Sequence, residues 1–343
     1  MTLTVSPYAG PADAWDDFGR EQAGWTHFHR FGWKPLIEDV FGHECPYLAA
    51  TGDGGTIEGI LPLVRVRSRL FGHYLVSMPF LNYGGPLGAP RAVQALAAAA
   101  ASKAAAEGAD LVELRSRIAL PLDLPVSHRK ITVVLPLPGD RDALWKAFGS
   151  KLRSQIKRPS REGVEVRMGP DQVEPFYQVF ARHMRDLGTP VLPREWFDAI
   201  AERFGAEAWF GAAWHEGRPI AGGAGLRWGT ELEMTWASAL ASHNRLAPNM
   251  LLYAAFMERA IDEGVSLFNF GRCTPGSGTH RFKLQWGSRD EPLWWYQSGP
   301  KGSGESGTPS PDQGVFSLGP RVWRHLPLPL ANALGPRIVR YIP

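Results

Sequence analysis

The segment FNFGRCTPGSGTHRFKLQWG, residues 268–287, places an aromatic strand, a Gly/Pro/Ser loop and a run of large side chains in direct succession. Phe282 and Trp286 are four residues apart and would share one helix face, so packing explains both rings. Lys283 lies next to that face and is harder to explain by packing. Arg272, at the end of the strand, can bind a phosphate or pair with a carboxylate. The segment therefore predicts either a site for an anionic group or a structural corner.

Phosphate-binding loops of the common kinds are absent from this sequence. The glycines of PGSG, residues 275–278, are typical turn residues, and no GxGxxG or P-loop spacing is present. Upstream, HNRLAPNML at 243–251 contains no glycine. His243, Arg245 and the free amides of a helix beginning near Pro248 still have the chemistry to bind a phosphate.

Further polar candidates lie at the ends of predicted elements. Glu113, in the strand LVELRS, can accept a proton from an amine, although pairing with Arg115 or hydration explains it equally well. NYGG at 82–85 lies between a strand and a helix, where a mixed α/β domain presents ligand-binding groups. Arg185 precedes a helix end in RHMRDLGTP, and we expect it to point into a cleft between domains.

The composition indicates a globular protein with a large core. Of 343 residues, 44% are hydrophobic, and the formal charge of +3 means that an anionic partner would need a local basic patch. Two cysteines make no disulfide framework, which predicts a reducing, cytoplasmic compartment. Ten scattered histidines predict no metal site, and no tightly bound cofactor is expected. The N-terminal residues and the hydropathy predict neither export nor a membrane span.

An internal repeat predicts how these residues are positioned. Residues 47–63 and 209–226 each read as a β-hairpin. Residues 90–116 and 248–272 each read as a helix, a glycine and a strand, with the glycines at Gly108 and Gly264. Each half also begins with two helices. We therefore predict an α/β fold of two duplicated domains, each with a mixed, mostly antiparallel sheet flanked by helices.

The expected domains are 1–150 and 151–300, followed by a linker and a tail over 301–343. A basic stretch after the boundary, from Lys151 to Arg167, is either a solvated helix face or a surface for a polyanion such as tRNA. The tail mixes apolar residues with arginines and has no acids from 315 onward, so it can pack on the body or contact an anionic membrane surface. Peripheral contact with the inner face of the membrane is thus one alternative.

The second half resembles the FemAB-type transferases, whose members contain two GNAT-like domains. The resemblance is carried by KLRSQIKR, MRDLGTP, NRLAPNMLLYAAFMERAIDEG, FNFGR and RFKLQWG. The first half, with FGHECPYLAA, GILPLVRVRSRLFG and LVSMPFLNYGG, is most similar to the subgroup associated with exosortase and exopolysaccharide loci. Together the motifs span about residues 20–297.

This resemblance implies transfer of an acyl or aminoacyl group from a carrier to an amine acceptor, as in cell-envelope or exopolysaccharide metabolism. The late Phe-Lys motif of such enzymes matches Phe282 and Lys283, with the lysine stabilising the oxyanion of the tetrahedral intermediate. Glu113 is the candidate base. The matched motifs place seven residues among the expected substrate-binding side chains: Asn82, Tyr83, Arg185, Arg245, Asn249, Tyr253 and Arg272.

The donor and the activity remain open at this stage. The glycine-free HNRLAPNML favours aminoacyl-tRNA over acyl-CoA as the co-substrate, and the acceptor is an amine, for example on an envelope precursor. The sequence departs from the family pattern at two places. LVELRS occupies the position where many Fem enzymes have Asp-Pro, and FNFGRC occupies the position where the subgroup usually has FDFGRS. The alternatives are an acyl-CoA-dependent N-acyltransferase and a catalytically silent GNAT-like binding module.

Overall fold

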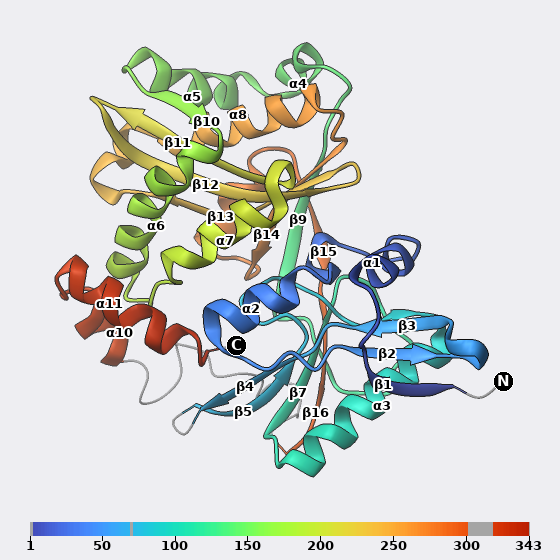
Figure 1. Ribbon diagram of the computed structural model, residues 1–343. Coiled ribbons are helices and arrows are strands. Elements are labelled where there is room, and N and C mark those ends of the chain that lie inside the picture. Colours follow the sequence, from blue (N-terminus) through green and yellow to red (C-terminus); the bar gives the residue numbers. More distant parts are fainter. Residues whose placement is uncertain (1–2, 69–70, 301–317, 343) are drawn as a thin grey trace. The chain divides into compact units, whose positions relative to one another are not determined.

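The computed structural model describes residues 3–68, 71–300 and 318–342 (Figure 1). By their internal contacts these residues divide into two compact units. Unit 1 contains the chain up to Lys130, the segment from Pro292 and the last residues from Ile338, whereas unit 2 contains Ile131–Glu291 and the helical segment ending at Arg337. The boundary expected near residue 150 differs from this division because residues 131–149 supply a strand and a helix to unit 2.

Among the described residues, unit 1 has two sheets, in the strand orders β1-β2-β3-β6 and β4-β5-β7-β16-β8. Its strands are β1 (Thr4–Pro7), β2 (Leu48–Thr51), β3 (Ile57–Leu61), β4 (Val64–Ser68), β5 (Gly72–Val76), β6 (Leu87–Gly88), β7 (Leu111–Ser116), β8 (Val126–Ser127) and β16 (Trp294–Ser298). Its helices are α1 (Ala12–Arg20), η1 (His27–His29), α2 (Trp33–Phe41), η2 (Asp53–Gly55) and α3 (Pro90–Glu107).

Unit 2 is built on one sheet in the order β10-β11-β12-β13-β14-β9-β15 within the described part of the chain. The strands are β9 (Ile131–Pro136), β10 (Glu165–Met168), β11 (Ala208–His215), β12 (Arg218–Trp228), β13 (Glu231–Ala239), β14 (Leu267–Cys273) and β15 (Arg289–Pro292). The helices are α4 (Arg141–Ala147), α5 (Ser150–Arg161), η3 (Pro170–Gln172), α6 (Val173–Leu187), α7 (Arg194–Phe204), η4 (Gly205–Glu207), η5 (Ala241–Leu246), α8 (Pro248–Asp262), α9 (Gly278–Leu284), α10 (Leu318–Trp323) and α11 (Leu328–Val339).

The predicted duplication is confirmed in both the order of elements and their pairing. Each unit contains the expected hairpin, β2-β3 or β11-β12, and each contains a parallel pair joined by a helix, β5-α3-β7 or β13-α8-β14. Gly108 and Gly264 follow the two crossover helices with φ of 64° and 76°, a region that favours glycine. The two units are thus variants of one mixed α/β fold.

Two strands belong to the sheet of the other half of the sequence. β9 directly follows β8 of unit 1 along the chain, yet it pairs antiparallel with β14 of unit 2. β16 follows all the strands of unit 2 along the chain and pairs antiparallel with β7 of unit 1. In each unit, therefore, the strand after the crossover helix pairs on one side with a strand that lies far away in sequence.

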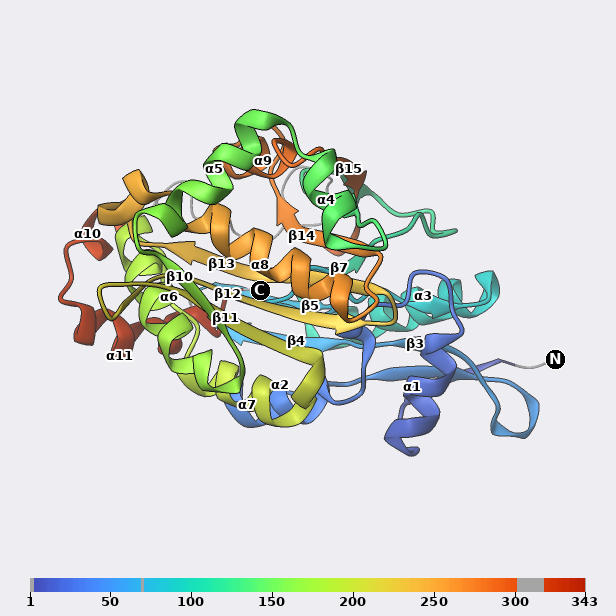
Figure 2. The ribbon, with the colours of Figure 1, turned by 90° about the horizontal axis from the view of Figure 1, so that it is seen from above.

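Helices cover both faces of the sheet of unit 2. Figure 2 shows α5 and α8 on one face and α6 and α7 on the other. On the α6 side, Phe176, Phe197 and Phe210 form edge-to-face contacts with centroids 5.0 and 5.7 Å apart. On the α8 side, Leu252, Phe256 and Ala260 are fully buried. Burial on both faces holds β13 and β14 in place.

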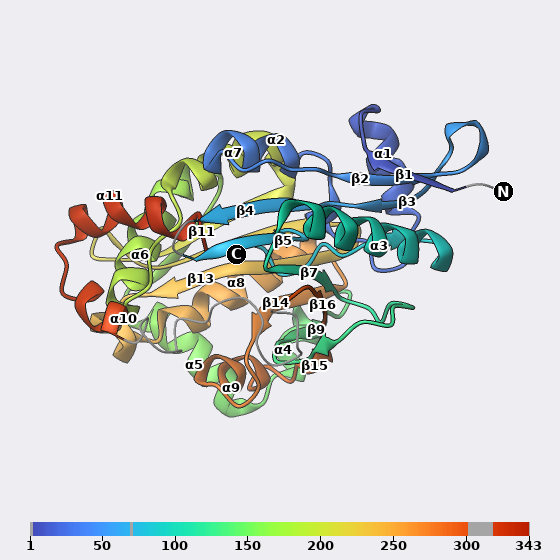
Figure 3. The same cartoon turned by 90° about the horizontal axis from the view of Figure 1, so that it is seen from below.

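The alanine-rich α3 packs closely on the sheets of unit 1 (Figure 3). Ala92, Leu96 and Ala100 are fully buried on its inner face. A Cβ on Gly59 of β3 would lie only 2.8 Å from the Ala92 Cβ, so the close approach requires glycine on the strand and a small residue on the helix. The repeated alanines therefore set the distance between helix and sheet.

The described part of the C-terminal tail packs on the protein. In unit 2 the Arg185 guanidinium donates to Leu326 O (2.9 Å), and a Cβ on Gly335 of α11 would lie 2.8 Å from Val191 N. In unit 1 the His43 imidazole donates to Arg340 O (2.6 Å). Residues 301–317, where the expected linker begins, lie outside the described residues. No helix among those described combines the length and hydropathy needed to cross a membrane.

Candidate active site

The loop before α9 is fixed by hydrogen bonds. Ser277 caps α9 by accepting from the His280 backbone N–H (3.1 Å), and His280 Nδ1 accepts from the Gly276 N–H (2.9 Å). Because Nδ1 accepts, Nε2 carries the proton and donates to Asp290 Oδ1 (2.9 Å). Arg281 also donates to Gly276 O (2.7 Å). The PGSG run is therefore a tied turn that sets the direction of α9.

Lys283 is buried beneath this turn, with only 2% of its surface exposed. Its Nζ donates to Gly271 O (2.6 Å) and Arg272 O (3.0 Å), both on β14. Burial lowers the pKa of Lys283 from 10.5 to about 8; the Arg272 charge also lowers it, whereas Cys273 and Glu233 oppose the shift. At neutral pH the side chain is thus a largely desolvated ammonium.

The two carbonyls reach Lys283 because β14 has a bulge. The register between β14 and β9 shifts between Asn269 and Arg272, and Gly271 has φ of 70°. Asn269 holds this bulge, since its Oδ1 accepts from the Gly271 N–H (2.8 Å) and from Thr132 Oγ1 (2.6 Å). The geometry around the ammonium therefore depends on a buried amide two residues earlier.

Two buried carboxylates complete the polar network. Asn269 Nδ2 donates to Glu231 Oε1 (2.8 Å) and to Glu233 Oε2 (3.2 Å). Both glutamates lie on β13 and, like Asn269, face the same side of the sheet, because Glu231 and Glu233 pair with Leu267 and Asn269 in parallel register. Sequence analysis did not identify these glutamates. The sequence does carry a signal for them, because Glu231 and Glu233 alternate with the apolar residues Leu232 and Met234 along the strand.

Phe282 and Tyr253 belong to an aromatic cluster beside Lys283. The Tyr253 ring on α8 stacks on Phe270 (5.6 Å, 21°) and meets Phe282 edge-on (5.1 Å), with Trp286 6.1 Å away. Burial raises the pKa of Tyr253 above its usual value. Phe282 is half-buried against the same core. Both rings thus pack, and Lys283, Phe282, Tyr253 and Arg272 are brought together around β14 and α9.

Two other expected substrate-binding residues lie where α8 begins. Ala247 precedes the helix with φ of 52°, and Pro248 is its first residue. Asn249 follows, and its buried Oδ1 has no hydrogen-bond partner among the described residues. Arg245, on η5, is exposed. Arg245 and the N-terminal end of this helix can hold an anion, although Pro248 has no N–H and the Met250 N–H donates to Ala247 O (3.0 Å).

Arg185 lies apart from the cluster around Lys283. Its Nε donates to Asp186 Oδ1 (2.7 Å), in addition to the bond that its Nη1 donates to Leu326 O. These two acceptors, on α6 and in the tail, explain the position of the Arg185 guanidinium, so no ligand is needed to explain it.

In unit 1, Glu113 is fully buried at the end of the parallel strand pair. Its carboxylate accepts from Arg115 Nε (2.8 Å) and Gln297 Nε2 (2.9 Å), and the Arg115 guanidinium lies 4.4 Å above the Trp295 ring. The pairing with Arg115 that the sequence suggested is therefore present. Gln297, on β16, is a partner that local sequence does not reveal.

Asn82 and Tyr83 lie in a buried loop that is attached to β7. Gly84 N–H donates to Arg115 O (2.9 Å), and Tyr83 contacts the Phe28 ring edge-on at 5.4 Å. Met78 and Phe80 in this loop have φ of 55° and 71°, which is strained backbone for residues with a Cβ. Such strain is concentrated at functional segments, and here it lies in the same loop as the two candidate residues Asn82 and Tyr83.

Known proteins share parts of the sequence and the fold of this chain. Residues 147–284 match the family model described as an acetyltransferase (GNAT) domain. Over 147 residues the chain is 26% identical to the UDP-N-acetylmuramoylpentapeptide-lysine N(6)-alanyltransferase of Weissella viridescens; this alignment covers 41% of the chain and 44% of the relative. The chain thus matches less than half the length of that curated relative.

Solved structures share the fold over most of the chain. The crystal structure of FemX has a TM-score of 0.64 at 13% identity, covering 86% of this chain and 97% of FemX. L-PGS from Bacillus licheniformis has a TM-score of 0.56 at 13% identity, covering 93% and 97%. A tandem GNAT protein from the clavulanic acid biosynthesis pathway has a TM-score of 0.50 at 14% identity, covering 87% and 99%. The chain therefore has a tandem GNAT fold, and its residues 147–284 carry the GNAT-type domain.

Proposed function

We propose that this protein is a Fem-like acyl- or aminoacyltransferase that moves its group from a carrier to an amine. The observation that supports this proposal most directly is the buried Lys283 ammonium, held by the bulge of β14 inside the segment that matches the GNAT model. The Weissella relative, a UDP-N-acetylmuramoylpentapeptide-lysine N(6)-alanyltransferase, supports the same reaction class.

In the proposed reaction, the amine nitrogen of the acceptor attacks the carbonyl carbon of an ester or thioester. A C–N bond forms, the C–O or C–S bond to the carrier breaks, and the amine proton passes to a base while the carrier leaves as an alcohol or thiol. Two of the three Lys283 N–H donors are used by Gly271 O and Arg272 O, which leaves one for the oxyanion. A desolvated ammonium stabilises that charge more strongly than a hydrated one.

The remaining roles are assigned as part of this proposal. Glu113 is the candidate base, which would require its bonds from Arg115 and Gln297 to rearrange. Arg272, Asn249 and Arg245 are proposed to bind the carrier, and Asn82 and Tyr83 the acceptor. We favour aminoacyl-tRNA as the donor because the segment before α8 lacks glycine. Envelope or exopolysaccharide metabolism on the cytoplasmic side is the proposed setting.

One observation favours a second function, a GNAT-like binding module without catalysis. Lys283 is almost inaccessible and donates to two backbone carbonyls, as a purely structural clamp would. In that case the protein would bind an activated intermediate without transferring a group.

A transfer assay tests these alternatives. The full chain is incubated with UDP-N-acetylmuramoyl-pentapeptide and either alanyl-tRNA or acetyl-CoA, and the acceptor mass is measured. Addition of an alanyl group supports the Fem-like transferase, and addition of an acetyl group supports the acyl-CoA alternative. Transfer that is equal in the wild type and Lys283→Ala would overturn the role of Lys283, and absence of transfer from both donors would favour the binding module.

A further inference from the structure

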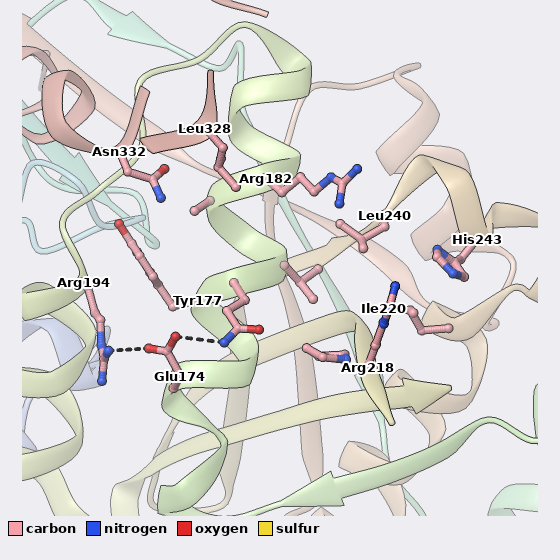
Figure 4. Close-up of a pocket in the computed structure, with 14 residues that line it drawn as sticks. Glu174, Tyr177, Arg182, Arg194, Arg218, Ile220, Leu240, His243, Leu328 and Asn332 are labelled. Carbon is pink, nitrogen blue, oxygen red and sulfur yellow. Dashed lines mark hydrogen bonds and ion pairs between the residues drawn. The ribbon is translucent and has the colours of Figure 1, made fainter. Parts of the chain in front are cut away.

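Unit 2 contains a cavity that the proposed reaction does not use. It has a volume of about 470 Å³ and lies between α6, α7, the start of β12, η5 and α11 (Figure 4). That volume is within the roughly 300–1,000 Å³ range of small-molecule sites. Neither Lys283 nor any residue of its network lines the cavity.

The charged groups around the cavity are unevenly paired. On one side, Glu174 forms an ion pair with Arg194 and accepts from Gln178 Nε2 (2.9 Å). On the other side, the guanidinium groups of Arg182 and Arg218 form no ion pair or hydrogen bond with any described residue. Figure 4 shows these two arginines on the same side as His243, away from the Glu174 pair. This side therefore carries uncompensated positive charge.

The rest of the lining is mainly apolar. Ile220, Leu240 and Leu328 supply hydrocarbon surface, and Asn332 of α11 adds an amide whose buried Oδ1 has no hydrogen-bond partner in the described part of the chain. A buried acceptor without a donor destabilises the folded protein. A ligand with an O–H or N–H group would satisfy it.

We propose that this cavity binds a small organic anion, a phosphate monoester or a carboxylate that carries a short apolar group. Arg182 and Arg218 line the side of the cavity that has no carboxylate, and an anion bound there can accept charge-assisted hydrogen bonds from both guanidinium groups. The apolar group packs on Ile220, Leu240 and Leu328. The site is independent of the transfer reaction proposed for Lys283.

Isothermal titration calorimetry on the full chain tests the ligand chemistry. The probes are hexyl phosphate, hexanoate, inorganic phosphate and 1-hexanol, which separate the two kinds of anion and the contributions of charge and hydrocarbon. Hexyl phosphate or hexanoate is expected to bind at least tenfold more tightly than either inorganic phosphate or 1-hexanol. Failure of both amphiphilic anions to bind at millimolar concentration would overturn the proposal.

Variants locate the binding. Arg182→Ala/Arg218→Ala is expected to weaken binding of the better anion at least tenfold, whereas Arg203→Ala, which removes an exposed arginine outside the cavity on α7, is expected to leave it unchanged. Because Arg182 and Arg218 are exposed, their removal leaves the core intact, and thermal unfolding checks this. Equal affinity in the wild type and the double variant would also overturn the proposal.

Discussion

The buried ammonium of Lys283 makes activity depend on pH. Burial lowers its pKa to about 8, and the proposed oxyanion role requires the protonated form. We predict that turnover falls as pH rises above about 8. A pH–rate profile for Lys283→Arg should lack this limb, because a guanidinium stays charged, although its planar shape should support only slow turnover. An unchanged alkaline limb in Lys283→Arg would assign the titration to another group.

The same pKa shift predicts a pH-dependent stability. An unfolded lysine titrates near 10.5, so between pH 8 and 10.5 the unfolded state binds a proton that the folded state does not, and stability rises with pH. Relative to Lys283→Met, the free energy of unfolding of the wild type should gain on the order of 2 to 3 kcal/mol between pH 7 and 10. Urea unfolding of both proteins measures it. Parallel pH curves would show that Lys283 titrates normally.

Replacement of Lys283 by alanine should lower turnover and leave folding nearly intact. Under the proposed function, Lys283→Ala lowers turnover by roughly 10²- to 10³-fold, the usual effect of losing one oxyanion donor. Lys146→Ala, at an exposed lysine on α4, is the matched control and should retain full activity. Phe282→Leu should reduce stability more than turnover because the Phe282 ring packs against Tyr253.

Asn269 is predicted to be essential for the bulge. Asn269→Ala removes the amide that accepts from the Gly271 N–H and donates to the two buried carboxylates. The free energy of unfolding should therefore fall by about 3 kcal/mol. Denaturant unfolding followed by tryptophan fluorescence measures this, with the exposed Asn244→Ala as control. A loss below about 1 kcal/mol would mean that the network rearranges around the missing side chain.

At the scale of elements, α5 presents a basic outer face. Leu152 and Ile156 are buried, whereas Lys151, Lys157 and Arg161 are exposed. The charge is partly used within the protein: Arg158 pairs with Glu162 (2.8 Å), and Lys157 lies 5.4 Å from the Trp145 ring.

We still predict that α5 binds a polyanion, with affinity that falls steeply between roughly 50 and 200 mM salt. Lys157→Glu/Arg158→Glu should weaken tRNA binding at least tenfold in a filter-binding assay, whereas Arg203→Glu on α7 should have little effect. Binding that is insensitive to salt and to these charges would leave α5 as a solvated surface.

Local sequence patterns predicted the helices and hairpins better than they predicted which distant strands and side chains pair. The hairpins, the crossover helices and the glycines after them follow from periodicity and from backbone preferences within a few residues, and the structure confirms them. Lys283 was recognised because a cation beside an apolar helix face is unusual. The bonds of Asn269 to Thr132 and of Glu113 to Gln297 depend on which strands pair, and pairing over more than a hundred residues has no local signal.

At the scale of the whole molecule, the described tail contributes bonds to each unit separately. Arg185 donates to Leu326 O in unit 2, and His43 donates to Arg340 O in unit 1. A chain that ends at residue 317 should therefore unfold at a lower temperature, by several degrees, in a thermal scan. Flotation of both lengths with anionic vesicles tests the membrane alternative. Equal flotation would remove the lipid role of the tail.

Because β16 pairs with β7, the sheet of unit 1 can be completed only late during synthesis on the ribosome. All strands of unit 2 leave the ribosome before Trp294, whereas β7 of unit 1 must wait for β16 to pair. At about 5–20 residues per second, that delay is on the order of ten to thirty seconds. During this time the nascent chain carries an open β7 edge, which is a template for wrong pairing and a surface for chaperones. The β7-β16 sheet of unit 1 is thus completed later than the sheet of unit 2.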